Sequence, residues 1–148
     1  MKSAEQSRRV ALPAHVLLLE DDSALSTALI SIVGCHLPTI RVSHADSVEQ
    51  AWGVLDRGRV DLVITDLHLP GLDGIAFIRR IRVRGWQRPV IVISGYGLDA
   101  VTEVREMLQI SAVVAKPFEV TALLICIAAA LHGRLHAGTN RRYDEPDK

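Results

Sequence analysis

Polar side chains that can bind a metal ion or a phosphoryl group follow four hydrophobic runs of this sequence. Glu20 and Asp21 come after the run HVLLL, and Asp66 ends the run VDLVITD. Ser94 ends the run PVIVIS, and Lys116 follows the run SAVVA. Because the carboxyl ends of parallel strands meet at one edge of a sheet, we expect these five side chains to converge there.

Such a set of side chains has a defined chemistry. Crowded carboxylates repel one another, and one of them stays protonated unless a cation lies between them. Oxygen ligands favour Mg²⁺ or Ca²⁺ over zinc, and a small Mg²⁺ site uses few carboxylates, retains water and recruits phosphate oxygens. Lys116 and Ser94 suit those phosphate oxygens, and a carboxylate such as Asp66 is a candidate phosphoryl acceptor.

The elements that must position these residues are visible in the hydrophobic pattern. The strongest runs are almost continuously apolar, which is typical of parallel strands covered on both faces. Together with two weaker runs they give five predicted strands, at residues 15–20, 39–44, 60–66, 89–94 and 111–115.

Segments with helical spacing separate the predicted strands. Apolar residues recur every three or four positions after each of the first three strands, and two further helices are predicted at 100–108 and 120–131. Asp46 or Ser47 is placed to cap the second helix, and Gly85 fits the end of the third. Alternating strands and helices predict an α/β fold, a doubly wound parallel sheet over residues 14–132. Residues 1–13 and 133–148 lack periodicity and are predicted to be mobile tails.

Composition narrows the class of protein. The chain has 148 residues, 49% of them hydrophobic, which suits one folded domain and excludes a disordered chain or a disulfide scaffold. Its 17 basic and 17 acidic residues cancel, so no net charge favours nucleic acid or an anionic membrane. The longest apolar stretch, 120–131, is too short to cross a bilayer, and the first residues lack the apolar core of a signal peptide. We therefore expect a cytoplasmic protein in which Cys35 and Cys126 are buried, reduced thiols.

Four stretches of this sequence together resemble one known family. VLLLEDD, DLVITDLHLPGLDG, VIVISGYG and VVAKPF occur in the order found in response-regulator receiver domains of bacterial two-component signalling. The resemblance covers about residues 14–132. It implies a (βα)5 fold in which the five strands lie in the flavodoxin-like order 2-1-3-4-5.

The resemblance also implies a role for each matching residue. Asp66 would be the phospho-acceptor, Lys116 would neutralise the phosphoryl oxygens, and Ser94 would bind them as the switch hydroxyl. The expected cofactor is Mg²⁺, held directly by Asp21 and Asp66, through water by Glu20, and by the backbone carbonyl of residue 68. Pro117 would follow a cis peptide bond that aims the lysine inward.

Asp22, His68 and Tyr96 lie close to the expected site residues in the sequence. Three acidic residues are adjacent after the first strand, and Asp22 suits the cap of the following helix rather than the metal site. His68 and Tyr96 stand two positions after Asp66 and Ser94, where side chains tune dephosphorylation in the family. The other five histidines are expected at the surface or its boundary: His15, His36, His44, His132 and His136.

The resemblance departs from the family in the expected output region. Val113 stands where many members carry a Tyr or Phe whose rotamer reports activation, so the aromatic–hydroxyl coupling should be absent or replaced. The predicted last helix is apolar on nearly every face, which would leave an exposed apolar patch or, since several of its residues are alanines, a surface of small residues. The expected partners are a sensor histidine kinase or histidine phosphotransfer protein, a downstream protein, and a second copy bound through the fourth-helix and fifth-helix face.

The leading prediction is thus a stand-alone receiver that signals by protein contact or phosphorelay, not an enzyme in the usual sense. A degenerate receiver that only binds partners is one alternative. A hydrolase with Asp66 as nucleophile is another, because His68 stands where such enzymes often carry an acid–base carboxylate. A flavodoxin-like redox carrier is disfavoured, since the acids of EDDSAL would repel a flavin phosphate.

Overall fold

The computed structural model describes residues 13–132, and these form an α/β domain with one five-stranded parallel sheet. The sheet is built from β1 (Ala14–Leu19), β2 (Ile40–Ala45), β3 (Leu62–Asp66), β6 (Val90–Ser94) and β7 (Ile110–Ala115). The strands lie in the order β2-β1-β3-β6-β7, which is the predicted 2-1-3-4-5 when only these five are counted. The predicted mobile tails lie outside the described residues.

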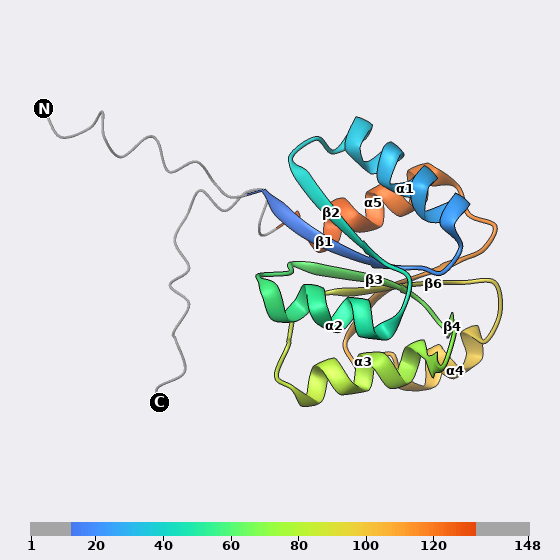
Figure 1. Ribbon diagram of the computed structural model, residues 1–148. Coiled ribbons are helices and arrows are strands. Elements are labelled where there is room, and N and C mark those ends of the chain that lie inside the picture. Colours follow the sequence, from blue (N-terminus) through green and yellow to red (C-terminus); the bar gives the residue numbers. More distant parts are fainter. Residues whose placement is uncertain (1–12, 133–148) are drawn as a thin grey trace, which may run out of the picture.

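Five helices cover the two faces of the sheet (Figure 1). On one face lie α1 (Ser23–His36) and α5 (Val120–Ala130), and on the other lie α2 (Val48–Arg57), α3 (Gly74–Val83) and α4 (Leu98–Val104). A two-stranded antiparallel hairpin of β4 (His68–Leu69) and β5 (Leu72–Asp73) follows β3. Among the described residues, no helix is both long and apolar enough to span a bilayer.

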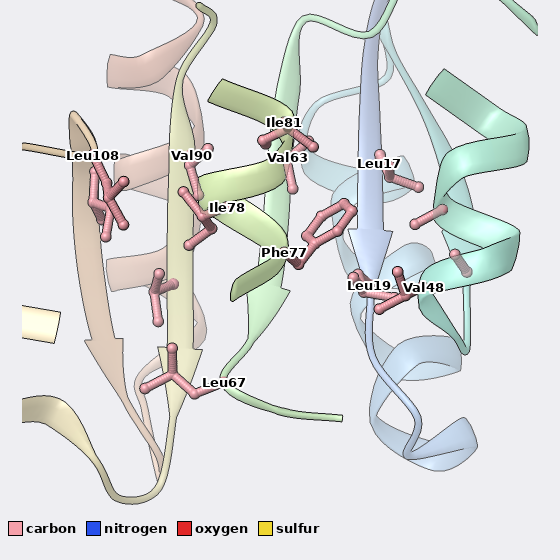
Figure 2. Packing of buried hydrophobic residues seen from close by; sticks show 14 of the residues in the cluster. Leu17, Leu19, Val48, Val63, Leu67, Phe77, Ile78, Ile81, Val90 and Leu108 are labelled. Carbon is pink, nitrogen blue, oxygen red and sulfur yellow. The ribbon is translucent and has the colours of Figure 1, made fainter. Parts of the chain in front are cut away.

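Each face of the sheet has its own core, because side chains alternate along every strand. Under α2, α3 and α4, Leu17 and Val63 pack against Phe77 of α3, which is fully buried. Figure 2 shows Phe77, Ile78 and Ile81 pointing from α3 toward the strands. Under α1 and α5, a second core contains alternate residues of the same strands.

The predicted helix caps are mostly confirmed. The Asp22 carboxylate accepts the backbone N–H groups of Ala24 and Leu25 at the start of α1. Ser47, rather than Asp46, caps α2, and Gly85 adopts a φ of +86° just after the end of α3.

Three predictions about individual elements and side chains were wrong. The fourth helix is shorter than 100–108 and starts earlier, since Gly97 with a φ of +77° precedes it. Cys35 is exposed and Cys126 is half-buried, because α1 and α5 each turn only one face to the sheet. His15 is buried, not peripheral, because it lies on β1 between two other strands.

Candidate functional site

Most of the predicted site residues lie close together at the carboxyl edge of the sheet. Asp66 is the last residue of β3, which pairs with β1 on one side and β6 on the other. Glu20 directly follows β1, Ser94 ends β6, and Lys116 directly follows β7. Parallel pairing therefore brings together residues that are far apart in the sequence.

Lys116 holds the two buried carboxylates of this edge. Its Nζ donates to Oδ2 of Asp66 at 2.6 Å and to Oε2 of Glu20 at 3.1 Å. The side chain of Glu20 is 1% exposed and that of Asp66 is 8% exposed, whereas that of Lys116 is 26% exposed. One partly accessible ammonium group is thus shared by two carboxylates that are almost removed from solvent.

The protonation of this cluster follows from burial and charge. Burial raises the pKa of Glu20 above its ordinary value of 4.5, although the Asp22 backbone N–H and the Lys116 ammonium oppose the shift. Burial alone would lower the pKa of Lys116. The hydrogen bonds and negative charges of Asp66 and Glu20 outweigh that effect and raise the lysine pKa above 10.5.

Asp21 is placed differently from its two expected co-ligands. It is exposed, and among residues 13–132 no three acidic, histidine or cysteine side chains lie together as a metal-binding group. Glu20 instead accepts the backbone N–H of Asp22 through Oε1 at 3.1 Å. Of the three carboxylates expected to bind the metal, those of Glu20 and Asp66 therefore lie together on Lys116. The third, that of Asp21, lies on the exposed side, although Asp21 follows Glu20 directly in the sequence.

The Ser94 hydroxyl is bound to its own loop. Ser94 is fully buried, and its Oγ donates to the backbone carbonyl of Tyr96 at 2.8 Å. The Lys116 backbone N–H donates to the Ser94 carbonyl at 2.9 Å, which ties the ends of β6 and β7 together. The peptide bond between Lys116 and Pro117 is cis, as the resemblance implied.

His68 and Tyr96 form an aromatic pair beside Asp66. Their rings are stacked, with centroids 3.8 Å apart and an angle of 23° between the planes. The His68 backbone N–H donates to Oδ1 of Asp66 at 3.1 Å, so the carboxylate has a partner on each oxygen. Both rings are exposed, and they stand at the edge of the site.

Two features of this edge were not predicted from the sequence. Gly74 begins α3 directly against the backbone of Asp66 and Leu67, where an added Cβ would collide with the Asp66 carbonyl oxygen. Beside the aromatic pair lies an open groove of about 600 Å³, lined by residues of the hairpin and of the starts of α3 and α4. No sequence pattern revealed the close approach of Gly74 to Asp66.

The sequence of this chain is similar to those of known proteins. The sequence model described as "Response regulator receiver domain" matches residues 16–128. The chain is 38% identical over 128 residues to the response regulator protein FleR of Pseudomonas aeruginosa, covering 84% of this chain and 26% of that protein. It is 33% identical over 121 residues to the regulatory protein VirG of Agrobacterium tumefaciens, covering 81% of this chain and 44% of that protein.

Solved structures give the same picture of the fold. The N-terminal domain of an uncharacterized protein from Wolinella succinogenes matches with a TM-score of 0.74 and 27% identity, over 82% of this chain and 97% of that one. The receiver domain of an HD domain-containing protein from Pseudomonas fluorescens also matches with a TM-score of 0.74, at 24% identity, over 82% of this chain and 97% of that one. By contrast, the chain spans only 26% and 44% of the length of the two curated relatives named above.

Proposed function

Because this chain belongs to the response regulator receiver domain family, we propose that it accepts a phosphoryl group on Asp66 and signals through protein contact. The observation that carries this proposal is the contact of Lys116 with both Asp66 and Glu20 at the carboxyl edge of the sheet. The partly exposed Lys116, the acidic side chains and the hydroxyl of Ser94 are the groups that phosphoryl transfer needs, since its transition state is stabilised mainly by positioned charge.

Mg²⁺ is the cofactor that this edge suits. Glu20 and Asp66 already share one cation, the Lys116 ammonium, and their carboxylate oxygens are the hard ligands that Mg²⁺ prefers. We propose that the ion binds Asp66 directly, Glu20 through water and the backbone carbonyl of His68, and that Asp21, which lies on the exposed side, would join them as a direct ligand when the ion binds. When bound, the ion would neutralise the oxygens of Asp66 and of the phosphoryl group.

The transfer is a displacement at phosphorus. A carboxylate oxygen of Asp66 attacks the phosphorus of a phosphohistidine on a sensor kinase or a phosphotransfer protein. The P–N bond breaks, and the donor imidazole leaves with the electron pair and takes up a proton. Lys116 balances the charge of the phosphoryl oxygens, and water later attacks phosphorus to release phosphate and regenerate the carboxylate of Asp66.

Ser94 links this chemistry to a conformational change. Its hydroxyl donates to the Tyr96 carbonyl, and it would exchange that acceptor for a phosphoryl oxygen after transfer. Such an exchange would shift the loop that precedes α4, and it needs no aromatic side chain at Val113.

The surface of α4 and α5 is the proposed contact for a downstream protein. Ile125 of α5 is 63% exposed and Tyr96 is 67% exposed, so apolar surface is available on this side. This surface suits a protein partner better than a nucleic acid. We place that contact in the cytoplasm. The proposal covers signalling by contact with a downstream protein and signalling by phosphorelay.

Intact mass after incubation with a small phosphodonor tests the assignment of Asp66. With Mg²⁺ the wild type should gain one phosphoryl group, without Mg²⁺ it should gain almost none, and Asp66→Asn should gain none. Asp73→Asn is the matched control, because Asp73 caps α3 and asparagine caps equally well. It should gain the group as the wild type does.

Two other results would contradict the proposal. A folded wild type that gains no phosphoryl group from several donors would favour a receiver that only binds partners. Continuous release of phosphate from the donor, dependent on Asp66 and His68, would favour the hydrolase.

A further inference from the structure

The exposed face of α3 is basic. The segment from Gly74 to Arg88 contains five arginines and no acidic residue. Helix α3 buries Phe77, Ile78 and Ile81, which leaves Arg79, Arg80 and Val83 exposed on the opposite side. No ion pair joins Arg79 or Arg80 to an acidic side chain of the described residues.

The exposed face of the neighbouring helix carries the opposite charge. Asp99 and Glu103 on α4, and Glu106 in the turn after it, are exposed. Arg105 also lies in that turn, but its guanidinium donates to the Ser111 carbonyl of β7. The acidic side chains make no ion pair within the described part of the chain. In a chain with no net charge, the two signs are therefore separated onto adjacent helices.

The two charged faces adjoin each other. Helices α3 and α4 lie side by side (Figure 1), and Arg82 of α3 donates to the carbonyls of Leu108 and Gln109 after α4. Ile75 of α3 and Ala100 of α4 line the same groove. The Arg82 hydrogen bonds thus join the C-terminal part of α3 to the turn after α4.

Each face also exposes one large apolar side chain in an equivalent place. Val83 is 86% exposed and follows Arg79 by four positions, one helical turn. Met107 is 63% exposed and follows Glu103 by the same four positions, in a turn where the Leu108 N–H still donates to the Val104 carbonyl. Helix α3, and α4 together with the turn after it, therefore each present a charge and, four positions later, an exposed apolar residue.

We propose that this α3–α4 surface binds a second copy of the chain. A two-fold axis along the boundary between the two helices places α3 of each copy over α4 of the other. Arg79 then faces Glu103 of the second copy, and Val83 faces its Met107, in two symmetric sets. A two-fold interface must be self-complementary, and the separation of charge onto these two helices meets that requirement.

This surface differs from the α4–α5 face predicted from sequence for a second copy. The α4–α5 face offers exposed apolar side chains, Ile125 of α5 and Tyr96 before α4, whereas the α3–α4 surface combines opposite charges with apolar side chains. Because the contacts are mostly exposed ion pairs, the dimer should be weak and sensitive to salt.

Charge reversal on each helix tests the proposal in sedimentation equilibrium. The mass of the wild type should rise from 16.2 kDa toward twice that value with concentration. The association should weaken between about 0.05 M and about 0.5 M salt, as the Debye length shrinks. Arg79→Glu with Arg80→Glu reverses α3, and Glu103→Arg with Glu106→Arg reverses α4. Each double variant alone should need at least about tenfold higher concentration to associate, since attraction becomes repulsion.

The decisive sample is the mixture of the two reversed variants. In a mixed pair both halves of the two-fold interface again join opposite charges, so the mixture should associate at least as well as the wild type. Circular dichroism melts of each variant establish that it is folded. The control Ile125→Ser lies on α5 and should leave association unchanged.

Three results would overturn the proposal. The first is that the wild type stays at 16.2 kDa at every concentration in low salt. The second is that the mixture fails to associate although each variant is folded. The third is that association is lost in Ile125→Ser and retained in both charge reversals, which would assign the dimer to the α4–α5 face.

Discussion

The ammonium nitrogen of Lys116 lies 2.6 Å from the carboxylate of Asp66, a residue 50 positions earlier in the chain. The same nitrogen contacts Glu20, and that carboxylate is the more deeply buried of the two. Two carboxylates facing one ammonium leave an excess of negative charge in a poorly solvated place. Under the proposed function this excess of negative charge would attract Mg²⁺, and burial of Glu20 makes its protonation sensitive to pH.

Glu20→Gln should remove this sensitivity to pH. The pKa of Glu20 is raised above 4.5 chiefly by burial, so the folded state binds this proton more tightly than the unfolded chain does. The contribution of Glu20 to stability is therefore complete below pH 4.5 and is lost as pH rises through its folded-state pKa. Without Mg²⁺, the free energy of unfolding of the wild type minus that of Glu20→Gln should increase as the pH falls from 8 toward 4.5.

Denaturant titrations of both proteins at several pH values measure this difference. The pH dependence that comes from the other carboxylates is present in both proteins, so it cancels in the difference between their free energies of unfolding. A difference that stays constant, or that shrinks toward low pH, would contradict the burial of an ionised Glu20 in this cluster.

Gly74→Ala should destabilise the domain and impair phosphoryl transfer together. The new Cβ would meet the carbonyl oxygen of Asp66 and lie 2.8 Å from the Cα of Leu67, so the backbone that carries the acceptor must shift. Overpacking of this kind costs about 1–3 kcal/mol. Gly34→Ala is the matched control, because nothing lies near its added Cβ in α1 and alanine should stabilise that helix by about 0.5–1 kcal/mol. Equal unfolding free energies for the two variants would refute the close approach at Gly74.

The fold could be predicted from the sequence because the three central strands, β1, β3 and β6, are almost continuously apolar and fully buried. The first predicted strand, at 15–20, is observed at Ala14–Leu19, and the observed strand order is the one that the family resemblance implied. The β4–β5 hairpin was not predicted, since two-residue strands are too short to show a period. The fourth helix was misplaced because Gly97, which starts it, resembles an ordinary loop glycine.

The site could be predicted only as far as strand ends determine it. Asp66, Glu20 and Lys116 meet because parallel strands bring their ends together. The Ser94–Tyr96 hydrogen bond and the His68–Tyr96 stack depend on the path of a loop, which hydrophobic spacing does not encode. Asp21 is exposed because the chain turns outward after β1.

Tyr96→Ala should speed the loss of the phosphoryl group. The stacked ring of Tyr96 covers His68 next to Asp66, and its removal gives water more room to approach. An aromatic pair contributes about 0.5–1.5 kcal/mol, so the hydrolysis rate should rise by up to about tenfold. Single-turnover decay of the phosphorylated protein measures the rate. Tyr96→Phe, which keeps the ring, should decay as the wild type does, and a fast Tyr96→Phe would contradict a role for the stack.

Asp61→Ala should unfold the domain more readily without changing phosphoryl transfer. The Asp61 side chain is 2% exposed and accepts the His15 backbone N–H at 2.9 Å, Arg59 at 3.1 Å and Arg88 at 2.6 Å. It lies beside the start of β1, at the edge of the sheet opposite Asp66. Its removal leaves a buried N–H and two arginines without their shared acceptor.

Breaking a buried ion pair from one side costs about 3–5 kcal/mol, and the partial exposure of both arginines places this case near about 3 kcal/mol. Chemical denaturation measures the loss. Asp56→Ala is the control, because Asp56 is 69% exposed and only 3.7 Å from Arg84, so its loss should cost less than about 1 kcal/mol. Since neither aspartate touches the acceptor edge, the folded fraction of both variants should gain a phosphoryl group at the wild-type rate. A slower rate in folded Asp61→Ala would mean that this cluster also positions Asp66 through β3.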